Sequence, residues 1–575
     1  MELEPADTKN YNPPGMDADA YECKDGARPK CAVFGICSGN RGPCDAAASQ
    51  FAYFGLHAQQ HRGQESAGIL SMEVHDAVSA ANKKRKREDR ILPPGDKDLG
   101  RGWRSHPNLT ALHPRSMSRI KGKGLKVKTH IHKDFGLVTD VFTKEILPTL
   151  TGGVAIGHTR YSTSGSDKTA HNIQPFLVKY RDGHIGLTHN GDICNFRKIQ
   201  EQFVKAGTLF HSTSDSELIL HLISRSQKKT QPEQVMEALS ILEGAFSILM
   251  ITENYFFALR DPNGFRPLHM GVITSKRPDS KEQGPKKAPF YVFASETCAF
   301  DLIGAKLIRE VEPGEIIVID LNRASSHTQF KSLRLPRKYG VTPCIFEYVY
   351  FARADSYIFG SSVDQVRYHC GQQLARESPV PKGSNVVVIP VPTSANVAAL
   401  GYANECKKMG YDVRYDLGLV RNNYVGRTFI TPGQVDRALK VRRKFGVSKR
   451  VVKGAIVVLV DDSIVRGTTS MRLVNLLKEN GAKEVHFRSA SPPVKNPCFF
   501  GMDFPNPKEL IANKHDDIKS IGSAIGAESL AYLSWEGLKS AVMETKPSST
   551  TWCGACFTGS YPVPTPRAKT KTLDW

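Results

Sequence analysis

The chain has no apolar run long enough to cross a lipid bilayer. Its first thirty residues also lack an apolar core segment, and they carry acidic side chains such as Glu2, Glu4 and Asp7. This composition argues against both a secretory signal and a mitochondrial presequence. We therefore expect a cytoplasmic protein with no membrane partner. In a reducing compartment, its twelve cysteines serve catalysis, metal binding or the core more often than disulfides.

Acidic residues are also in short supply, because 57 Asp and Glu oppose 78 Lys and Arg and leave a net charge of +21. Such an excess of positive charge is typical of proteins that bind nucleic acids, but the basic residues of this chain do not form one stripe. The run KKRKREDR lies in a polar stretch of about residues 72–130, which we expect to be a disordered surface insertion, with nuclear localisation as an alternative role. The basic segment 437–453 precedes a phosphate-type loop, so a substrate with several phosphates explains it as well as DNA does. We expect no nucleic-acid partner.

A length of 575 residues exceeds the size at which one hydrophobic core stops growing, so we expect at least two domains. Residues 31–335 contain short apolar segments between glycines and polar turns, such as AVFGI, GVAIGH, FSILMI and EIIVID. These segments predict antiparallel strands with occasional helices. Over residues 336–575, strands such as NVVVIPV and AIVVLVDD alternate with helical stretches such as SMRLVNLLKENGA, which predicts a parallel α/β domain.

The most specific motif is AIVVLVDDSIVRGTTS, in which an apolar strand ends in two carboxylates, Asp461 and Asp462. A short loop with Gly467 then leads into a predicted helix. Backbone N–H groups at the start of a helix bind anions, and glycine lets the backbone approach a phosphate closely. The hydroxyls of Thr468 and Thr469 add hydrogen-bond donors. The two carboxylates suit a ribose diol or a magnesium ion that carries a diphosphate.

Other phosphate motifs are absent from this region, which has neither a GxGxxG pattern nor the Walker A spacing. A Rossmann or P-loop nucleotide site is therefore a poorer match. The plainest alternative is a capped strand-to-helix turn with solvated acids. The loop also contains Arg466, and we favour the phosphate site over that alternative.

This block resembles the phosphoribosylpyrophosphate (PRPP) loop of the type I phosphoribosyltransferases. Together with CIFEYVYFARADS, NYVGRTFI, HRGQESAGI, GHTRYST, THNGD and TSDSE, it is similar to the glutamine PRPP amidotransferase family, from Cys31 to Tyr561. The resemblance implies an α/β plus α+β protein. An N-terminal-nucleophile (Ntn) class II glutaminase domain, with stacked antiparallel sheets between helices, covers residues 31–335. A type I phosphoribosyltransferase domain with a parallel sheet and a C-terminal cluster-binding tail covers residues 336–575.

The reaction implied by the resemblance is the first committed step of purine synthesis. Glutamine, PRPP and water give 5-phosphoribosylamine, glutamate and pyrophosphate, and ammonia passes between the domains through an interior path. The resemblance also implies purine nucleotides as feedback inhibitors and a homo-oligomer, either a dimer or a tetramer. The competing hypothesis is a PRPP-binding regulatory paralogue with weakened or lost glutamine chemistry.

In the first domain, the resemblance implies that Cys31 is the nucleophile and the first residue of the mature chain. A free α-amine has a pKa of about 8, so one residue can supply both the thiol and its base. Arg160 and Asp215 match the residues that hold the carboxylate and the α-amino group of glutamine. Asn190 and Gly191 match the oxyanion hole, which stabilises charge on the amide oxygen.

In the second domain, the resemblance extends the PRPP site beyond the loop. Tyr424 and Arg427 match residues of a basic segment, 421–453, that folds over PRPP and excludes water. Ser463 belongs to the same PRPP-binding set as the other loop residues. Ser394 matches a hydroxyl that contacts magnesium together with the two aspartates of the loop.

Four cysteines form a further set: Cys344, Cys498, Cys553 and Cys556. Spacing alone leaves zinc, an iron–sulfur cluster and plain core residues open, because one CxxC accompanies two distant thiols. The segments PCIFEYVYF, SPPVKNPCFFG and CGACFTGSYP resemble those that hold one [4Fe–4S] cluster in the cluster-bearing branch of the family. In that branch the cluster is not the reaction centre, so we expect a structural or oxygen-sensitive role.

Several positions depart from the family pattern. The propeptide that the resemblance implies, residues 1–30, ends at Lys30 where the family has glutamate, and Ala32 replaces glycine after the nucleophile. Further replacements lie in the motifs of the second domain, at Ala354, Thr393 and Asn423. These changes motivate the hypothesis of a regulatory paralogue.

Overall fold

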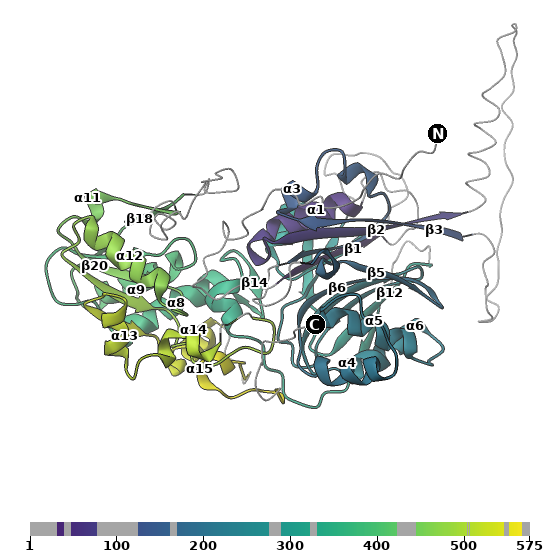
Figure 1. The fold of residues 1–575 in the computed structure, drawn as a ribbon. Coiled ribbons are helices and arrows are strands. Elements are labelled where there is room, and N and C mark those ends of the chain that lie inside the picture. The colour runs from purple at the N-terminus through teal and green to yellow at the C-terminus, as the bar shows by residue number, and fades with distance from the viewer. Residues whose placement is uncertain are drawn as a thin grey trace, which may run out of the picture.

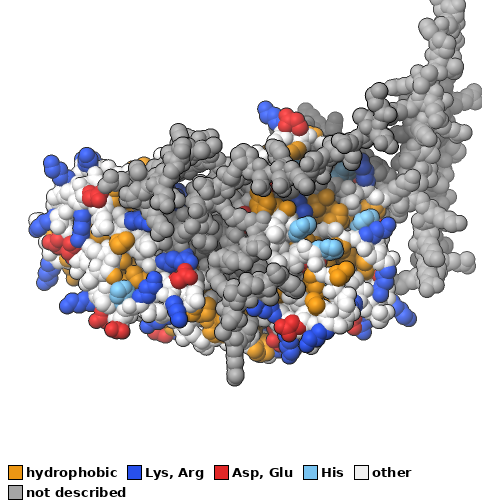
Figure 2. All heavy atoms as spheres, viewed as in Figure 1, with side chains coloured by type: hydrophobic (Ala, Val, Ile, Leu, Met, Phe, Trp, Pro, Cys, Tyr) orange, Lys and Arg blue, Asp and Glu red, His pale blue; other side chains and the backbone are white. Residues whose placement is uncertain are grey.

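The computed structural model of the chain describes residues 31–38, 48–76, 125–160, 169–274, 289–322, 330–422, 444–502, 504, 506–545 and 551–565. Figure 1 shows two lobes, with the N-terminal half in purple to teal and the C-terminal half in green to yellow. The predicted propeptide, Tyr424 and Arg427 lie outside the described residues. On the face drawn in Figure 2, the described Lys and Arg side chains are scattered over both lobes and do not form a stripe.

Two antiparallel sheets form the N-terminal lobe. The first has the strand order β11-β9-β10-β1-β4-β2-β3. Its strands are β1 Ala32–Ser38, β2 Ser66–Asp76, β3 Leu125–Phe135, β4 Val154–Arg160, β9 His269–Ile273, β10 Phe290–Ala294 and β11 Lys306–Glu310. The second has the order β13-β12-β8-β7-β6-β5. Its strands are β5 Phe176–Tyr180, β6 Gly183–Ile193, β7 Gly244–Thr252, β8 Tyr255–Arg260, β12 Glu315–Asp320 and β13 Phe330–Arg334.

Apolar side chains fill the layer between these sheets, where Val33 and Leu70 of the first meet Leu249 and Phe256 of the second. Helices cover both outer faces. The first sheet is covered by α1 (Ala48–Ala58), α3 (Val138–Val141) and α7 (Cys298–Ile303). The second is covered by α4 (Phe196–Lys205), α5 (Asp215–Arg225) and α6 (Gln231–Ser240). The predicted sandwich of stacked antiparallel sheets between helices is therefore confirmed.

The predicted surface insertion is shorter than the sequence suggested. Strands β2 and β3 pair continuously from Ser66 opposite Phe135 to Asp76 opposite Leu125. Residues 72–76 and 125–130 are thus strand, whereas 77–124 lie outside the described residues. The reason is that β3 is the edge strand of its sheet and stays partly exposed, so its Lys, Thr and His side chains resemble those of a loop.

The C-terminal lobe contains a parallel sheet with the order β17-β16-β20-β21-β22. Its strands are β16 Val386–Pro390, β17 Val413–Tyr415, β20 Ile456–Asp461, β21 Glu484–Ser489 and β22 Ser529–Tyr532. Alternate residues face opposite sides: Val386 and Val388 pack with one group of helices, Val387 and Ile389 with another. The predicted parallel sheet is confirmed, and its near-continuous apolar strands are explained by burial on both faces.

The helices of this lobe lie on both faces of the sheet (Figure 1). One face packs against α8 (Val363–Glu377), α9 (Asn396–Lys408) and α14 (Trp535–Thr545), and the other against α11 (Lys449–Val452), α12 (Thr468–Glu479) and α13 (Ile518–Ala524). The remaining named elements are short: β14 Tyr357–Ile358, β15 Ser361–Ser362, β18 Leu419–Arg421, β19 Phe445–Val447, α15 Ala555–Thr558, a π-helical turn η5 Glu347–Phe351, and the 3-10 turns η2 Gln60–Arg62, η3 Leu147–Thr149, η4 Ala170–Asn172, η6 Pro507–Glu509 and η7 Ile511–Asn513.

The two lobes share one apolar core, which includes Ala245 and Phe265 of the N-terminal lobe. The ring of Phe265 stacks on that of Phe500, with centroids 4.3 Å apart and an interplanar angle of 9°. Beside this stack, Arg266 donates from Nε and Nη2 to the Phe500 carbonyl oxygen at 3.1 and 2.9 Å. A segment of the C-terminal lobe is therefore anchored on the N-terminal lobe.

In the part of the chain described, no helix combines the length and the apolar character that crossing a membrane requires.

Candidate active sites

The predicted nucleophile, Cys31, lies directly before β1, the strand that pairs with β10 on one side and β4 on the other. Ala32 pairs with Thr159, so Cys31 lies beside the end of β4. The backbone of Cys31 has a φ of 32°, which is uncommon for a residue other than glycine and recurs at functional sites. Arg62 donates from Nε to the Cys31 carbonyl oxygen at 3.3 Å. The half-buried cysteine is thus held by its backbone at a strand end.

The residues predicted to form the oxyanion hole lie near the end of β6, in the other sheet. The Ser295 hydroxyl accepts from the backbone N–H of Val33 at 3.1 Å and from Asn190 Nδ2 at 3.5 Å. Ser295 therefore joins the start of β1 to Asn190. Asn190 Oδ1 is buried and has no hydrogen-bond partner among the described residues. At Gly191, a Cβ atom would lie 1.9 Å from the carbonyl oxygen of Ala245, so this position requires glycine.

The two residues predicted to hold glutamine lie on elements next to these strands. Arg160 ends β4 and Asp215 begins α5. Asp215 Oδ2 accepts from the backbone N–H of Ile193 at 2.9 Å, which fixes the start of α5 against the end of β6. His158 Nε2 lies 3.1 Å from the carbonyl oxygen of His189 and ties β4 to β6. Burial, followed by the charge of Arg160, lowers the pKa of His158 to about 3, so its ring is neutral.

These contacts place the five predicted glutaminase residues on neighbouring strand ends and on the start of one helix. A cation and a carboxylate on these neighbouring elements have charges complementary to those of a free amino acid, whose carboxylate and ammonium group they could bind.

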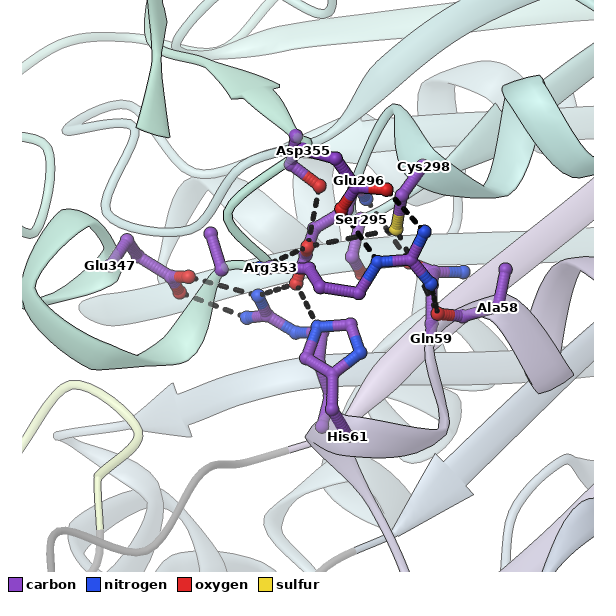
Figure 3. A network of polar contacts seen from close by, with 12 residues as sticks. Ala58, Gln59, His61, Ser295, Glu296, Cys298, Glu347, Arg353 and Asp355 are labelled. Carbon is purple, nitrogen blue, oxygen red and sulfur yellow. Dashed lines mark hydrogen bonds and ion pairs between the residues drawn. The ribbon is translucent and has the colours of Figure 1, made fainter. Parts of the chain in front are cut away.

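Sequence motifs alone did not reveal a buried network of ion pairs that includes Glu296 and Glu347 (Figure 3). Arg62 donates to both oxygens of Glu347 at 2.9 Å and to Glu296 at 2.6 Å. Burial alone would raise the pKa of Glu347, but Arg62 and Arg266 lower it. Burial likewise opposes the lowered pKa of Glu296, which His61 and Arg62 produce. Arg62 lies in the motif HRGQESAGI, but nothing in the sequence indicated its partners.

In the C-terminal lobe, the two predicted carboxylates lie where β20 ends. Asp462 accepts from the Ser394 hydroxyl at 2.5 Å and from the Ser463 hydroxyl at 2.7 Å. Its backbone N–H donates to Asp461 Oδ1 at 2.9 Å. Burial raises the pKa of both aspartates, and the charge of Asp462 raises that of Asp461 further. A cation that binds between them would relieve this repulsion, and Ser394 lies where it could contribute a third oxygen.

The loop after these carboxylates ends in a helix start with the features of an anion site. Gly467 has a φ of 81°, and a Cβ atom there would lie 2.2 Å from Ile511 Cδ1. Directly after it, Thr468 begins the twelve-residue helix α12. Thr468 Oγ1 is buried and has no hydrogen-bond partner among the described residues. An unsatisfied donor at a helix N-terminus fits a phosphate oxygen.

The other predicted PRPP residues are placed as follows. Arg466 donates to Glu509 from Nε at 3.0 Å and from Nη2 at 2.9 Å, so its guanidinium group is held at the side of the loop. Thr469 occupies the first turn of α12. Tyr424 and Arg427 lie outside the described residues, between β18 and β19.

The four predicted cluster thiols converge from three segments and are all buried. Cys344 bridges to Cys553 through the backbone, with Ile345 N–H donating to the Cys553 carbonyl oxygen at 3.2 Å. Burial raises the pKa of Cys344 to about 12, despite the opposing charge of Arg266. Burial also raises the pKa of Cys553 and Cys556, and the charges of the other thiols of the set raise both further. Within the described ranges, no three His, Cys, Asp or Glu side chains are arranged to bind a single metal ion.

The chain is similar to known proteins over nearly its whole length. Residues 158–277 match the family model described as a glutamine amidotransferase domain. The sequence is 40% identical to amidophosphoribosyltransferase 2, chloroplastic, of Arabidopsis thaliana, over 96% of this chain and 83% of that protein. It is 39% identical to the amidophosphoribosyltransferase of Bacillus subtilis, over 94% and 95% of the two chains.

Solved structures agree with the sequence relatives. The B. subtilis glutamine PRPP amidotransferase complexed with ADP and GMP matches with a TM-score of 0.72 at 38% identity, over 92% of this chain and 97% of that one. A structure described as the allosteric regulatory enzyme of purine biosynthesis matches with a TM-score of 0.73 at 38% identity, over 94% and 98%. The likeness therefore includes both lobes.

Proposed function

Because the chain belongs to the amidophosphoribosyltransferase family, we propose that its two lobes divide that family's reaction between the two sites described above. The protein is an enzyme of the first step of purine synthesis, which makes 5-phosphoribosylamine from glutamine, PRPP and water, with release of glutamate and pyrophosphate. One observation carries the assignment of the sites. The chain that holds Cys31 beside Asn190 and Arg160 also holds a buried aspartate pair before an anion-binding helix start.

In the N-terminal lobe, the Cys31 thiol attacks the side-chain amide carbon of glutamine. The free α-amine of Cys31, exposed once residues 1–30 are removed, accepts the thiol proton and passes it to the departing nitrogen. Asn190 Nδ2 and the backbone N–H of Gly191 donate to the oxygen that becomes negative. Ammonia leaves, and water then cleaves the thioester to glutamate. Arg160 and Asp215 hold the ends of glutamine during both steps.

In the C-terminal lobe, ammonia attacks C1 of PRPP and the C1–O bond to pyrophosphate breaks. The N–H groups at the start of α12 and the Thr468 hydroxyl hold the 5-phosphate. They lie next to Gly467, which has no side chain and so leaves the backbone accessible to the phosphate. Asp461 and Asp462 lie at the carboxyl edge of the sheet, where they can accept from the ribose hydroxyls. The proton lost by the attacking ammonia is taken up by solvent or by the leaving pyrophosphate.

Magnesium fits this loop on the evidence of its oxygen set. Asp461, Asp462 and Ser394 supply hard oxygen ligands, and the buried carboxylates are mutually repelled. When bound, the ion neutralises charge on the pyrophosphate group.

A [4Fe–4S] cluster fits the four buried thiols of Cys344, Cys498, Cys553 and Cys556. Thiolates are the ligands that iron–sulfur clusters require, and the charges of Cys344 and Cys498 raise the pKa of both Cys553 and Cys556, which indicates that the four lie close together. We propose that a cluster held here ties the start of the C-terminal lobe to segment 498–500 and to the tail. Its contribution is to folding and to oxygen sensitivity.

The finer statements about partners are also proposals. Feedback inhibition by purine nucleotides is supported by the B. subtilis relative, whose structure is a complex with ADP and GMP. Assembly into a dimer or tetramer and residence in the cytoplasm remain predictions, and the Arabidopsis relative is named as chloroplastic.

The test of this function separates the two sites within one purified enzyme. Glutamate and pyrophosphate are measured with glutamine and PRPP, and pyrophosphate is measured again with ammonia in place of glutamine. We expect one glutamate for each pyrophosphate in the first assay, and continued pyrophosphate release in the second. Glutamate release without any PRPP turnover would overturn the assignment of the C-terminal site.

A further inference from the structure

A buried arginine lies between the nucleophile and the C-terminal lobe. Arg62 is 1% exposed, and its Nε donates to the Cys31 carbonyl oxygen at 3.3 Å. Its two terminal nitrogens each donate to one oxygen of Glu347 at 2.9 Å, in a two-pronged ion pair. One planar guanidinium group therefore binds the backbone of Cys31 through Nε and a carboxylate of the other lobe through its two terminal nitrogens.

Glu347 is fixed on both sides by the N-terminal lobe, although it belongs to the C-terminal half of the chain. It begins η5, and its side chain is 0% exposed. Arg266 donates from Nη1 to Glu347 Oε1 at 2.9 Å and from its other nitrogens to the Phe500 carbonyl oxygen. Glu347 thus lies between two arginines that each contact a different part of the junction.

The charges of this group balance, since Arg62 and Arg266 face Glu296 and Glu347. All four side chains are at most 1% exposed. Burying charges is costly, and removing one partner leaves an uncompensated charge in a dry environment. Such a group holds its members in one geometry, which gives Arg62 little freedom to move away from Cys31.

Figure 3 shows how the carboxylates lie around this site. Glu296 and Glu347 approach from opposite sides, with His61 below them. Glu296 accepts from the backbone N–H of Arg353 at 2.9 Å and from the Ser356 hydroxyl at 2.7 Å. A second contact between the lobes therefore supports the same network, but only Glu347 engages Arg62 with both oxygens.

We propose that Glu347 is a positioning residue for the glutamine half-reaction: it fixes Arg62, whose Nε–H fixes the Cys31 carbonyl and so orients the nucleophile. The C-terminal lobe thereby sets the geometry of a thiol that lies in the N-terminal lobe. This inference rests on the proposed role of Cys31. It assigns no contact with substrate to Glu347, and it predicts no role for Glu347 when ammonia replaces glutamine.

The test variant is Glu347→Gln, which keeps the shape and one acceptor oxygen but removes the charge. The matched control is Glu315→Gln, because Glu315 is 1% exposed and also forms a two-pronged pair, with Arg309 at 2.7 Å, away from Cys31. For both variants, kcat and KM are measured with glutamine and with ammonia, together with the midpoint of thermal unfolding.

We expect Glu347→Gln to lower kcat with glutamine by about tenfold or more, because small displacements of a reacting group are costly. The ammonia reaction should stay near the wild-type value, and Glu315→Gln should leave the ratio of the two activities unchanged. An equal loss of both activities, or an unchanged glutamine kcat, would overturn the proposal. A wild-type enzyme without any glutamine turnover would instead contradict the proposed function.

A second variant covers the case in which Glu347→Gln does not fold. Arg62→Lys keeps the positive charge between the two carboxylates, but an ammonium group cannot bind Glu347 with two parallel bonds and also reach Cys31. We expect a folded protein that has lost most of its glutamine activity and keeps its ammonia activity. Retention of the wild-type glutamine kcat by Arg62→Lys would overturn the proposal as well.

Discussion

The Ser394 hydroxyl donates to Asp462 Oδ2 at 2.5 Å and so joins two loops of the C-terminal lobe. Ser394 follows β16 and Asp462 follows β20, which are neighbouring parallel strands. Ligands of open parallel α/β sheets bind at this edge, outside the carboxyl ends of the strands. The contact therefore marks the place at which the proposed magnesium ligands and the PRPP loop meet.

We predict that Ser394→Ala raises the KM for PRPP by about tenfold to a hundredfold, because a hydrogen bond to a charged group contributes about 1.5–3 kcal/mol. Glutamine binding, in the other lobe, should not change. Steady-state kinetics with varied PRPP and magnesium measure the effect. The control is Ser523→Ala, which removes an exposed hydroxyl that donates to the carbonyl oxygen of Lys519 in its own helix, at 3.1 Å. Equal KM values for the two variants would contradict a role of Ser394 in binding.

Replacing both aspartates of the loop, Asp461→Asn with Asp462→Asn, should abolish transfer to PRPP. The same variant should unfold at a higher temperature than wild type at neutral pH without magnesium. Because the pKa values of both aspartates are raised in the folded protein, the native state binds their protons more tightly than the unfolded chain does. Ionisation of the pair therefore lowers the stability of the folded wild-type protein as pH rises. The two Asn side chains cannot ionise, so the variant avoids this loss of stability. The difference in unfolding temperature between the variant and wild type should therefore shrink at acid pH. Calorimetry at two pH values measures it, and a variant less stable at neutral pH would argue against a strained carboxylate pair.

Gly467→Ala should weaken PRPP binding as well as stability. Its φ of 81° costs an alanine about 1–2 kcal/mol, and the added Cβ would lie 2.2 Å from Ile511 Cδ1, next to the proposed phosphate site. The matched control is Gly454→Ala, with a φ of 71° and nothing within 4 Å of the new Cβ. Both variants should lose stability, but only Gly467→Ala should raise the KM for PRPP. Equal kinetics would show that the loop tolerates a side chain.

Cys553→Ser should prevent the proposed cluster from closing. Protein purified without air should be brown and hold about four irons per chain, whereas the variant should be colourless, less soluble and more easily cleaved by protease at the junction. Cys406→Ser is the control, because Cys406 is a buried free thiol of α9 outside the set. Colourless, fully active wild-type protein with one zinc per chain would show that these cysteines bind a metal, but that the metal is zinc and not an iron–sulfur cluster.

The sequence was informative where function is concentrated in short segments. The strand ending in Asp461 and Asp462, the glycine turn and the helix after it are contiguous, so periodicity and residue type were enough to predict them. The sequence was less informative for β3, whose half-exposed edge position permits polar residues that are typical of loops.

The ion network could not be predicted for a different reason. Arg62 and Glu347 are 285 residues apart, and their pairing depends on how the lobes pack. A lone arginine or glutamate in an apolar segment says only that a partner must exist, because an unpaired buried charge is too costly. Which partner it is depends on tertiary structure. The same holds for Ser295, which joins β1 to Asn190 without belonging to any motif.

The role of Cys31 as the N-terminal nucleophile can be tested by mass spectrometry of the active enzyme after incubation with a glutamine analogue that carries an electrophilic diazoketone. We predict a mature chain that begins at Cys31, with one label on that thiol. Cys37 provides an internal control, because burial raises the pKa of its thiol and it is 0% exposed. Glutamine-active protein that still begins at Met1, or that carries the label elsewhere, would contradict Cys31 as the nucleophile.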